Sequence, residues 1–354
     1  MYDAATHAYS DAGIDVRNDV GSFICCVEDF WDGNSITDEY MPDQLGAKLR
    51  PLFTVSGDGL QGLAHAYMHI MAGVSDLVVV ESHSKLSDVT SKDLIEDMGF
   101  DPHFGRMEGV NPKYLAGLEM RRYLEESGST HEDCASVVAK NRRNALKNSR
   151  AVYGENLTKE DVLSSEEVAS PLTKREIAGS ADGAVVLVVA SAKRARRLTR
   201  KPVWISGISF FTDTPNIEEM DLGQALYALN AAKKAYQMAR IRNPATQLDF
   251  AEVDDTFAYK ELQHIEALGL AKRAGKFVSS GKGDRDGTLP INPSGGSLGM
   301  GNFIEATPLT RVYESVLQLR GEAGKMQLSN PKRCVVQSWR GLPTQTGAVA
   351  VLSR

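Results

Sequence analysis

The sequence predicts an α/β protein built from two similar halves, and three observations lead to this fold class. Short apolar segments of strand length alternate with segments of helical periodicity along most of the 354 residues. Each half has a glycine-rich turn followed by a buried helix that ends in glycine, at residues 56–59 with Gly73 and at residues 295–297 with Gly321. The composition, 42% hydrophobic and 24% charged, is that of a globular chain long enough for about two domains.

The first half begins with apolar residues at helical spacing, which predict a helix over residues 2–12. An apolar run predicts a buried strand over residues 20–27. Residues 59–72 form a helical pattern that is apolar on more than one face, which is typical of a helix inside a fold. Residues 77–80 predict a strand covered on both faces. The polar, charge-rich residues 85–178 are expected to be an insertion in this half.

The second half follows a further buried strand at residues 184–190 and a basic helix start at residues 193–197. Its predicted strands cover residues 203–208, 250–253, 335–337 and 348–352. Its predicted helices cover residues 221–242, 259–270 and 309–324. We therefore expect two domains, residues 1–198 and residues 199–354.

Composition also excludes several classes of protein. The 40 basic and 46 acidic residues give a net charge of −6, whereas a general nucleic-acid binder carries a basic surplus. The longest apolar stretch, residues 183–192, is about half of what a membrane-spanning helix needs. No signal segment opens the chain, and the four cysteines lack CxxC spacing, so Cys25 and Cys26 are expected to be buried, reduced thiols. We expect a soluble, cytoplasmic protein without a metal site.

Five motifs run in a fixed order over nearly the whole chain: Ser56-Gly57-Asp58-Gly59-Leu60 with Ile70-Met71-Ala72-Gly73, Lys140-Asn141-Arg142-Arg143-Asn144-Ala145, Ser180-Ala181-Asp182-Gly183-Ala184, Asn292-Pro293-Ser294-Gly295-Gly296, and Gln318-Leu319-Arg320-Gly321-Glu322-Ala323-Gly324. Together they resemble the thiolase superfamily, nearest to its sterol-carrier-protein-type and archaeal branches. The resemblance implies a five-layered αβαβα fold made of two duplicated halves, with the family's first strand missing before Met1. It also implies coenzyme A (CoA) thioester substrates and no covalently bound cofactor.

The sequence departs from the family at every side chain that carries its chemistry. Ser56 stands at the position of the nucleophilic cysteine, and Asp254 and Asn302 stand at two histidine positions. Glu305 and Pro308 replace glycines of the motif that contains Asn302, and the C-terminal loop, residues 337–341, contains no cysteine. Two interpretations of Asp254 and Asn302 are open: they bind and deprotonate a substrate hydroxyl in a retro-aldol cleavage, or the active site has drifted in a non-catalytic subunit.

Ser56 and His83 also have alternative interpretations. Ser56 is a nucleophile only if a neighbouring base activates it, and otherwise it is a helix N-cap or a substrate-positioning group. His83 follows a buried strand and is the candidate substitute base, or else a surface residue.

Four further positions are predicted to bind substrate. Gly296 and Gly341 keep glycine where the family brings the backbone close to the thioester, so their amides are candidate oxyanion donors. Asn141 and Arg142 belong to a basic cluster. The resemblance implies that this cluster contacts CoA phosphates; the alternative is that it forms a solvated helix face.

The sequence therefore predicts an acyl-CoA-binding subunit of a complex that cleaves or forms carbon–carbon bonds, of thiolase or retro-aldolase type. The alternative is a silent homologue that scaffolds an active thiolase. The resemblance implies a homodimer core in a hetero-oligomer, with a zinc-ribbon and OB-fold small subunit or a second thiolase as partner. The acidic, aromatic residues 28–40 are the candidate partner surface, or a surface loop with one or two aromatic side chains turned inward.

Overall fold

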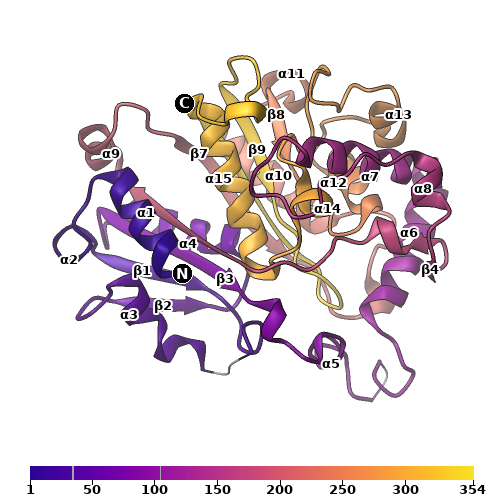
Figure 1. Ribbon diagram of the computed structural model, residues 1–354, viewed down its shortest axis with the longest axis horizontal. Helices are drawn as coiled ribbons and strands as arrows, with labels where there is room; N and C mark the ends of the chain where they lie inside the picture. Colours follow the sequence, from indigo (N-terminus) through magenta and orange to yellow (C-terminus); the bar gives the residue numbers. More distant parts are fainter. Residues whose placement is uncertain (34–35, 104) are drawn as a thin grey trace.

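Two four-stranded sheets and the helices around them make up the fold (Figure 1). The computed structural model describes residues 1–33, 36–103 and 105–354. The strands of one sheet all come from residues 22–190 and those of the other from residues 204–353. The expected α/β class with two similar sheets is confirmed.

The first sheet has the order β2-β1-β3-β6 and consists of β1 (Ser22–Cys26), β2 (Leu52–Val55), β3 (Leu77–Ser84) and β6 (Gly183–Ala190). β1 is parallel to β2 and β3, whereas β6 is antiparallel to β3. The prediction missed β2 because this short edge strand is half-exposed and lacks a continuous apolar run. β3 extends to Ser84, four residues beyond its apolar part, and thereby carries polar side chains into the interior.

The second sheet has the order β7-β10-β9-β8 and consists of β7 (Trp204–Thr212), β8 (Phe250–Glu252), β9 (Arg333–Gln337) and β10 (Thr346–Ser353). It shares with the first sheet a parallel pair followed by an antiparallel strand. β8 is parallel to β9, and β10 is antiparallel to both β9 and β7. β10 thus corresponds to β6. Within the described ranges no strand covers the outer edge of β6, which instead borders an apolar hollow of about 820 Å³.

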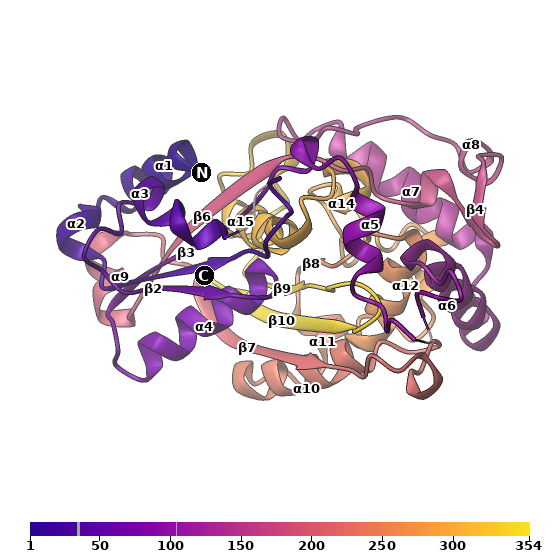
Figure 2. The ribbon, with the colours of Figure 1, turned by 90° about the horizontal axis from the view of Figure 1, so that it is seen from below.

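Helices and sheets alternate in five layers (Figure 2). α1 (Tyr2–Ala12) and α3 (Met41–Leu45) cover the outer face of the first sheet. α4 (Gly59–Met71) and α15 (Thr307–Arg320) lie between the sheets, and α10 (Leu226–Ala239) and α12 (Ala258–Ala267) cover the far face of the second sheet. The expected αβαβα arrangement is confirmed.

Small residues allow the two central helices to approach each other and the sheet. A Cβ atom on Gly59 would lie 2.7 Å from the Cβ atom of Leu309, so there is no room for a side chain between the backbones of α4 and α15 at this point. A Cβ atom on Gly62 would lie 1.8 Å from the sulfur of Cys26 in β1. All four cysteines are buried and free, as expected for Cys25 and Cys26.

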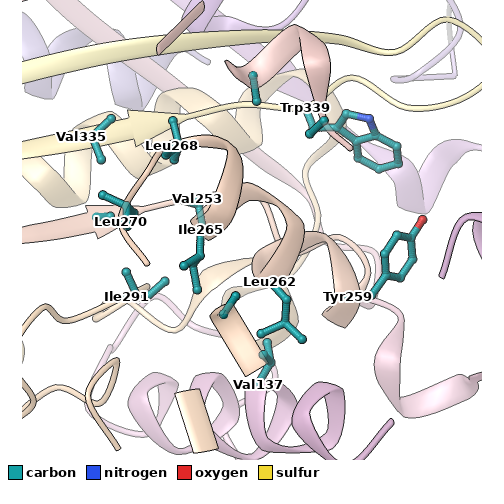
Figure 3. Packing of buried hydrophobic residues seen from close by; sticks show 14 of the residues in the cluster. Val137, Val253, Tyr259, Leu262, Ile265, Leu268, Leu270, Ile291, Val335 and Trp339 are labelled. Carbon is teal, nitrogen blue, oxygen red and sulfur yellow. The ribbon is translucent and has the colours of Figure 1, made fainter. Parts of the chain in front are cut away.

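The insertion holds α5 (Lys92–Asp97), α6 (Pro112–Ser127), α7 (His131–Ala145), α8 (Lys159–Leu163), β4 (Glu167–Ala169) and β5 (Leu172–Thr173). α7 packs against α12 and the short α14 (Gly296–Met300). Figure 3 shows Val137 of α7 next to Leu262 of α12, with Ile265 and Val253 further into the same core. The insertion therefore shares the core of the second half.

The remaining helices are short: α2 (Val16–Asp19), α9 (Ala192–Leu198), α11 (Pro244–Gln247) and α13 (Ala274–Ser279). The long helix predicted over residues 221–242 begins only at Leu226, because Asp221 forms a turn in which its carboxylate accepts the amide of Gly223. Among the helices of the described ranges, none combines the length and the apolar character needed to cross a lipid bilayer.

Candidate functional site

A pocket of about 740 Å³ lies where loops from both halves meet. It is lined by Ser56 before α4, Asp254 after β8, Asn302 before α15 and Gly341 after β9. Four residues that are far apart in the sequence are thus brought to one cavity. Apolar side chains form much of the remaining wall: Val27, Phe30, Trp31, Ile95, Met98, Ile177, Phe257, Ile304, Trp339, Leu342 and Pro343. This volume and mixture of side chains are typical of a small-molecule site.

Ser56 does not cap α4. Asp58 is the N-cap residue, and its Oδ1 atom accepts the amides of Leu60 and Gln61 at 2.9 and 3.0 Å. The Ser56 hydroxyl instead donates to Glu28 Oε1 at 3.0 Å, and Arg340 pairs with the same carboxylate. A carboxylate already neutralised by a guanidinium is a weak base toward a hydroxyl group.

Asp254 is held in a buried ion pair. Its Oδ2 atom lies 2.7 Å from Arg311 Nη2, and both side chains are almost fully buried. Burial is the largest cause and raises the pKa of Asp254, but the charges of Arg311 and His264 and the hydrogen bonds from Arg311 and the Thr256 amide together outweigh it and bring this pKa below its usual range. Asp254 is therefore an ionised carboxylate with little tendency to accept a proton.

Asn302 is oriented by its own loop. Its Oδ1 atom accepts the amide of Ile304 at 3.0 Å and the Thr307 hydroxyl at 3.1 Å. Its Nδ2 group makes no hydrogen bond to any part of the chain that the structure describes, and the residue lines the pocket. Asn302 thus offers N–H donors to a substrate oxygen, a role that does not require a base.

Three further polar residues of the pocket, Glu28, Asp58 and Glu305, were not predicted as site residues. Asp58 and Glu305 are each 2% exposed and line the pocket. The only sequence signal for Glu305 was that a carboxylate replaces a glycine of the family motif. Glu28 was predicted only as the first residue of a candidate partner surface, and it reaches the site through the fold of its loop.

His83 lies on β3, outside the described lining of the pocket. Its Nδ1 atom is 2.8 Å from Glu81 Oε1, and its Nε2 atom is 3.4 Å from the Tyr40 hydroxyl and 3.5 Å from Asp32 Oδ2. Burial lowers the pKa of His83, but the hydrogen bond and charge of Glu81, with those of Asp32, raise it overall. The imidazole is therefore engaged within the protein.

The remaining predicted binding residues lie outside the described lining of the pocket. Asn141 is buried and donates to Asp255 and Glu261, in both cases at 2.7 Å. The backbone of Gly296 passes so close to Asp255 that a Cβ atom would lie 2.1 Å from that carboxylate. Arg142 donates to the carbonyl of Tyr153 and stacks over its ring. These contacts join α7 to α14 and α12.

The candidate partner segment, residues 28–40, turns partly inward. Phe30 and Trp31 both line the pocket; Trp31 is buried, whereas Phe30 is half-exposed. The Tyr40 hydroxyl donates to Asp32. Residues 34 and 35 of this segment lie outside the described residues. Within the part of the chain that is described, no three His, Cys, Asp or Glu side chains are grouped to hold a metal ion.

Comparison with known proteins agrees with this architecture. A family profile described as "Thiolase C-terminal domain-like" matches residues 210–354. An acetyl-CoA acetyltransferase of Methanothermobacter thermautotrophicus is 30% identical over 295 residues, which are 82% of this chain and 76% of the relative. A 17-hydroxy-3-oxo-4-pregnene-20-carboxyl-CoA lyase of Mycobacterium tuberculosis is 29% identical over 79% of this chain and 75% of its own length.

One solved structure has the same fold over nearly the whole chain. The "Ltp2-ChsH2(DUF35) aldolase" superposes with a TM-score of 0.86 at 23% identity, and the match covers 99% of this chain and 91% of that chain.

Proposed function

The chain belongs to the thiolase superfamily, and on this premise we propose that it binds acyl-CoA thioesters as a subunit of a complex that makes or breaks carbon–carbon bonds. The observation that carries the proposal is the 740 Å³ pocket in which Ser56, Asn302 and Gly341 meet. Its location between the two halves and its apolar wall suit an acyl chain next to a polar thioester group.

The side chains favour retro-aldol or aldol chemistry over acyl transfer to the protein. The hydroxyl at the nucleophile position is bonded to a carboxylate that Arg340 already pairs with. Asn302 offers amide donors, which would stabilise the negative charge on the oxygen of a thioester enolate without forming a covalent bond. The names of two similar proteins, a CoA lyase and an aldolase, support this choice of reaction.

The subunit role is supported by the similar aldolase structure, because its name, Ltp2-ChsH2(DUF35) aldolase, joins Ltp2 to a second component. We propose that this chain likewise forms a homodimer core within a hetero-oligomer in the cytoplasm. Native mass spectrometry of the complex purified from its source organism tests this assembly. A heteromer with a small zinc-bearing subunit is the expected result, and a stable homo-oligomer alone would contradict it.

Substrate binding has a direct test at Gly341. A Cβ atom on Gly341 meets no other atom within 4 Å, so a side chain there extends into open space at the pocket without disturbing the fold. We expect Gly341→Leu to weaken acetyl-CoA binding at least tenfold in calorimetric titration, because it occupies pocket volume, and Gly341→Ala to bind nearly as well as the natural protein. Equal binding by Gly341→Leu would locate the thioester elsewhere.

The second candidate is a catalytically silent homologue that scaffolds an active thiolase. The Asp254–Arg311 ion pair favours this candidate, because the predicted base is engaged in the pair. The triple variant Ser56→Ala, Asp254→Asn, Asn302→Ala separates the two functions. Loss of activity in a purified complex that is still folded and assembled supports the enzyme. Full activity of the complex with the triple variant supports the scaffold.

A further inference from the structure

Glu305 lines the pocket and has a buried carboxyl oxygen without a hydrogen-bond partner in the described part of the chain. It lies in the 3-10 turn Ile304–Ala306 that leads into α15, and only 2% of the residue is exposed. Its Oε2 atom is buried and has no hydrogen-bond partner among the described residues. A buried polar atom without a partner is costly, so such atoms in folded proteins call for an explanation, and a bound substrate is one.

Asp58 presents a second carboxyl group from the adjacent helix. While its Oδ1 atom caps α4, its Oδ2 atom is buried and, in the described part of the chain, lacks a hydrogen bond of good geometry. A Cβ atom on the next residue, Gly59, would lie 3.2 Å from the carbonyl oxygen of Glu305, so the two elements touch. Two buried carboxyl groups therefore line one pocket from neighbouring elements.

We propose that Glu305 is the catalytic acid–base residue of this site, that its substrates are 3-hydroxyacyl thioesters, and that Asp58 is a positioning residue that controls its protonation. This inference rests on the proposed function, since it assigns a proton carrier to the carbon–carbon bond chemistry of the same pocket. Glu305 takes the role that was predicted for Asp254. Arg311 holds Asp254 as a weak base, whereas Glu305 forms no ion pair with the described residues.

The surroundings of Glu305 favour proton uptake. Burial is the largest cause that raises its pKa well above the usual range, and the charges of Asp58 and Asp32 raise it further. Burial also raises the pKa of Asp58, although the Ser338 hydroxyl and two backbone amides act against it. The titratable groups on the elements packed against this turn are Asp58, Asp32, Glu81 and His83 on β3, Arg311 and Glu314 on α15, and Asp182 before β6.

In the proposed reaction Glu305 both accepts the proton and returns it. In the cleavage direction the Glu305 carboxylate takes the proton of the 3-hydroxyl group, the bond between Cα and Cβ breaks, and Cβ becomes a carbonyl carbon. The electron pair of that bond forms the thioester enolate, whose oxygen Asn302 stabilises. Protonated Glu305 then gives its proton to Cα, which yields a shorter acyl thioester and returns the carboxylate. The step needs no oxidant or reductant.

The same residue would remove an α-proton from a bound thioester in the reverse direction, and this allows a test without knowing the full substrate. The full-length protein, with any partner that co-purifies, is incubated with acetyl-CoA in D₂O, and deuterium in the acetyl group is measured by mass spectrometry. Binding of acetyl-CoA is measured separately by calorimetry. We expect Glu305→Gln to bind acetyl-CoA normally and to lose exchange by about 100-fold or more.

Two further variants complete the design. Asp58→Asn keeps the N-cap because asparagine caps as well as aspartate, but it removes a neighbouring negative charge. Exchange requires the carboxylate, so its rate rises with pH through the pKa of Glu305, and Asp58→Asn shifts this rise to lower pH. Glu266→Gln, which changes another carboxyl group whose pKa burial raises, lies outside the described pocket lining and leaves exchange unchanged.

The outcomes distinguish this inference from the proposed function. Binding of acetyl-CoA without exchange, or unchanged exchange in Glu305→Gln, would overturn the role of Glu305 and leave substrate binding intact. A pH profile that Asp58→Asn does not move would overturn the role of Asp58. No binding of acetyl-CoA by the natural protein would overturn the proposed function and the role of Glu305 with it.

Discussion

Asp254 and Arg311 form a buried ion pair, with 2.7 Å between Oδ2 and Nη2, at the base of the pocket. Arg311 also donates to the Ser297 hydroxyl at 2.6 Å and lies 3.7 Å from Asp255 Oδ1. One guanidinium on α15 thus joins the segment after β8 to α14. The position at which the family resemblance implies a catalytic histidine has become part of the structural core.

Loss of this guanidinium is expected to destabilise the fold. Arg311→Met leaves Asp254 and Asp255 buried without a counter-charge, which typically costs about 3–5 kcal/mol of unfolding free energy. Chemical denaturation measures this change. Lys201→Met is the control, because Lys201 pairs with Glu322 at an exposed site and its loss costs about 1 kcal/mol or less. Similar values for both variants would contradict the prediction.

Ser56→Ala is expected to leave the chemistry largely intact. The hydroxyl is bonded to Glu28 and has no base free to activate it, so α-proton exchange of acetyl-CoA should fall by less than about tenfold. Intact-mass measurement of the natural protein with acetyl-CoA should detect no acetyl adduct. An adduct that disappears in Ser56→Ala would instead identify Ser56 as a nucleophile.

Asn302→Ala is expected to lower the exchange rate about 100-fold while acetyl-CoA still binds, because a donor to the enolate oxygen is removed. Thr307→Val is the companion variant. It removes one of the two groups that hold Asn302 Oδ1 but keeps the amide, so it should lower the rate by a smaller factor. Equal rates in Asn302→Ala and the natural protein would exclude the donor role.

The pH dependence of stability has an identifiable source in Glu252. Burial raises its pKa from 4.5 to about 8, although hydrogen bonds from Ser294 act against this. Between these two values the folded chain binds a proton that the unfolded chain releases. The free energy of unfolding therefore falls as the pH rises from 4.5 to about 8, by an amount on the order of a few kcal/mol.

Glu252→Gln tests this assignment. In the natural protein the Ser294 amide donates to Glu252 Oε1 at 3.0 Å, and the Ser294 hydroxyl donates to Oε2. Glutamine keeps an acceptor for the amide and a partner for the hydroxyl, but it cannot titrate. Urea denaturation at several pH values should show a flatter profile for this variant between pH 4.5 and 8. An unchanged slope would place the titration on other groups.

The buried strands and central helices were predictable because their residues carry the information locally. The runs in β1, β3 and β6 are continuously apolar, and the glycines of α4 mark a helix that must lie close to its neighbours. β2 was missed because an edge strand needs no apolar pattern, and its position depends on pairing with β1.

Part of the site was also visible in the sequence. Four positions were singled out because they either depart from a family pattern or retain it, and all four line one pocket: Ser56, Asp254, Asn302 and Gly341. His83 was singled out because it follows a buried strand, and Asn141 and Arg142 because they belong to a basic cluster. Each of the three is engaged in contacts away from the described pocket lining.

The sequence by itself determined the fold class, the two halves and the residue types at the site, because these follow from local apolar patterns and motif order. Only the tertiary structure decided which carboxyl groups hold charge and which lack a partner. Arg311 lies 57 positions from Asp254 in the sequence but neutralises it in space, while Glu305 is left with an unpaired oxygen beside Asp58. The protonation state of a carboxyl group depends on burial and on neighbouring charges, and both are set by contacts between distant parts of the chain.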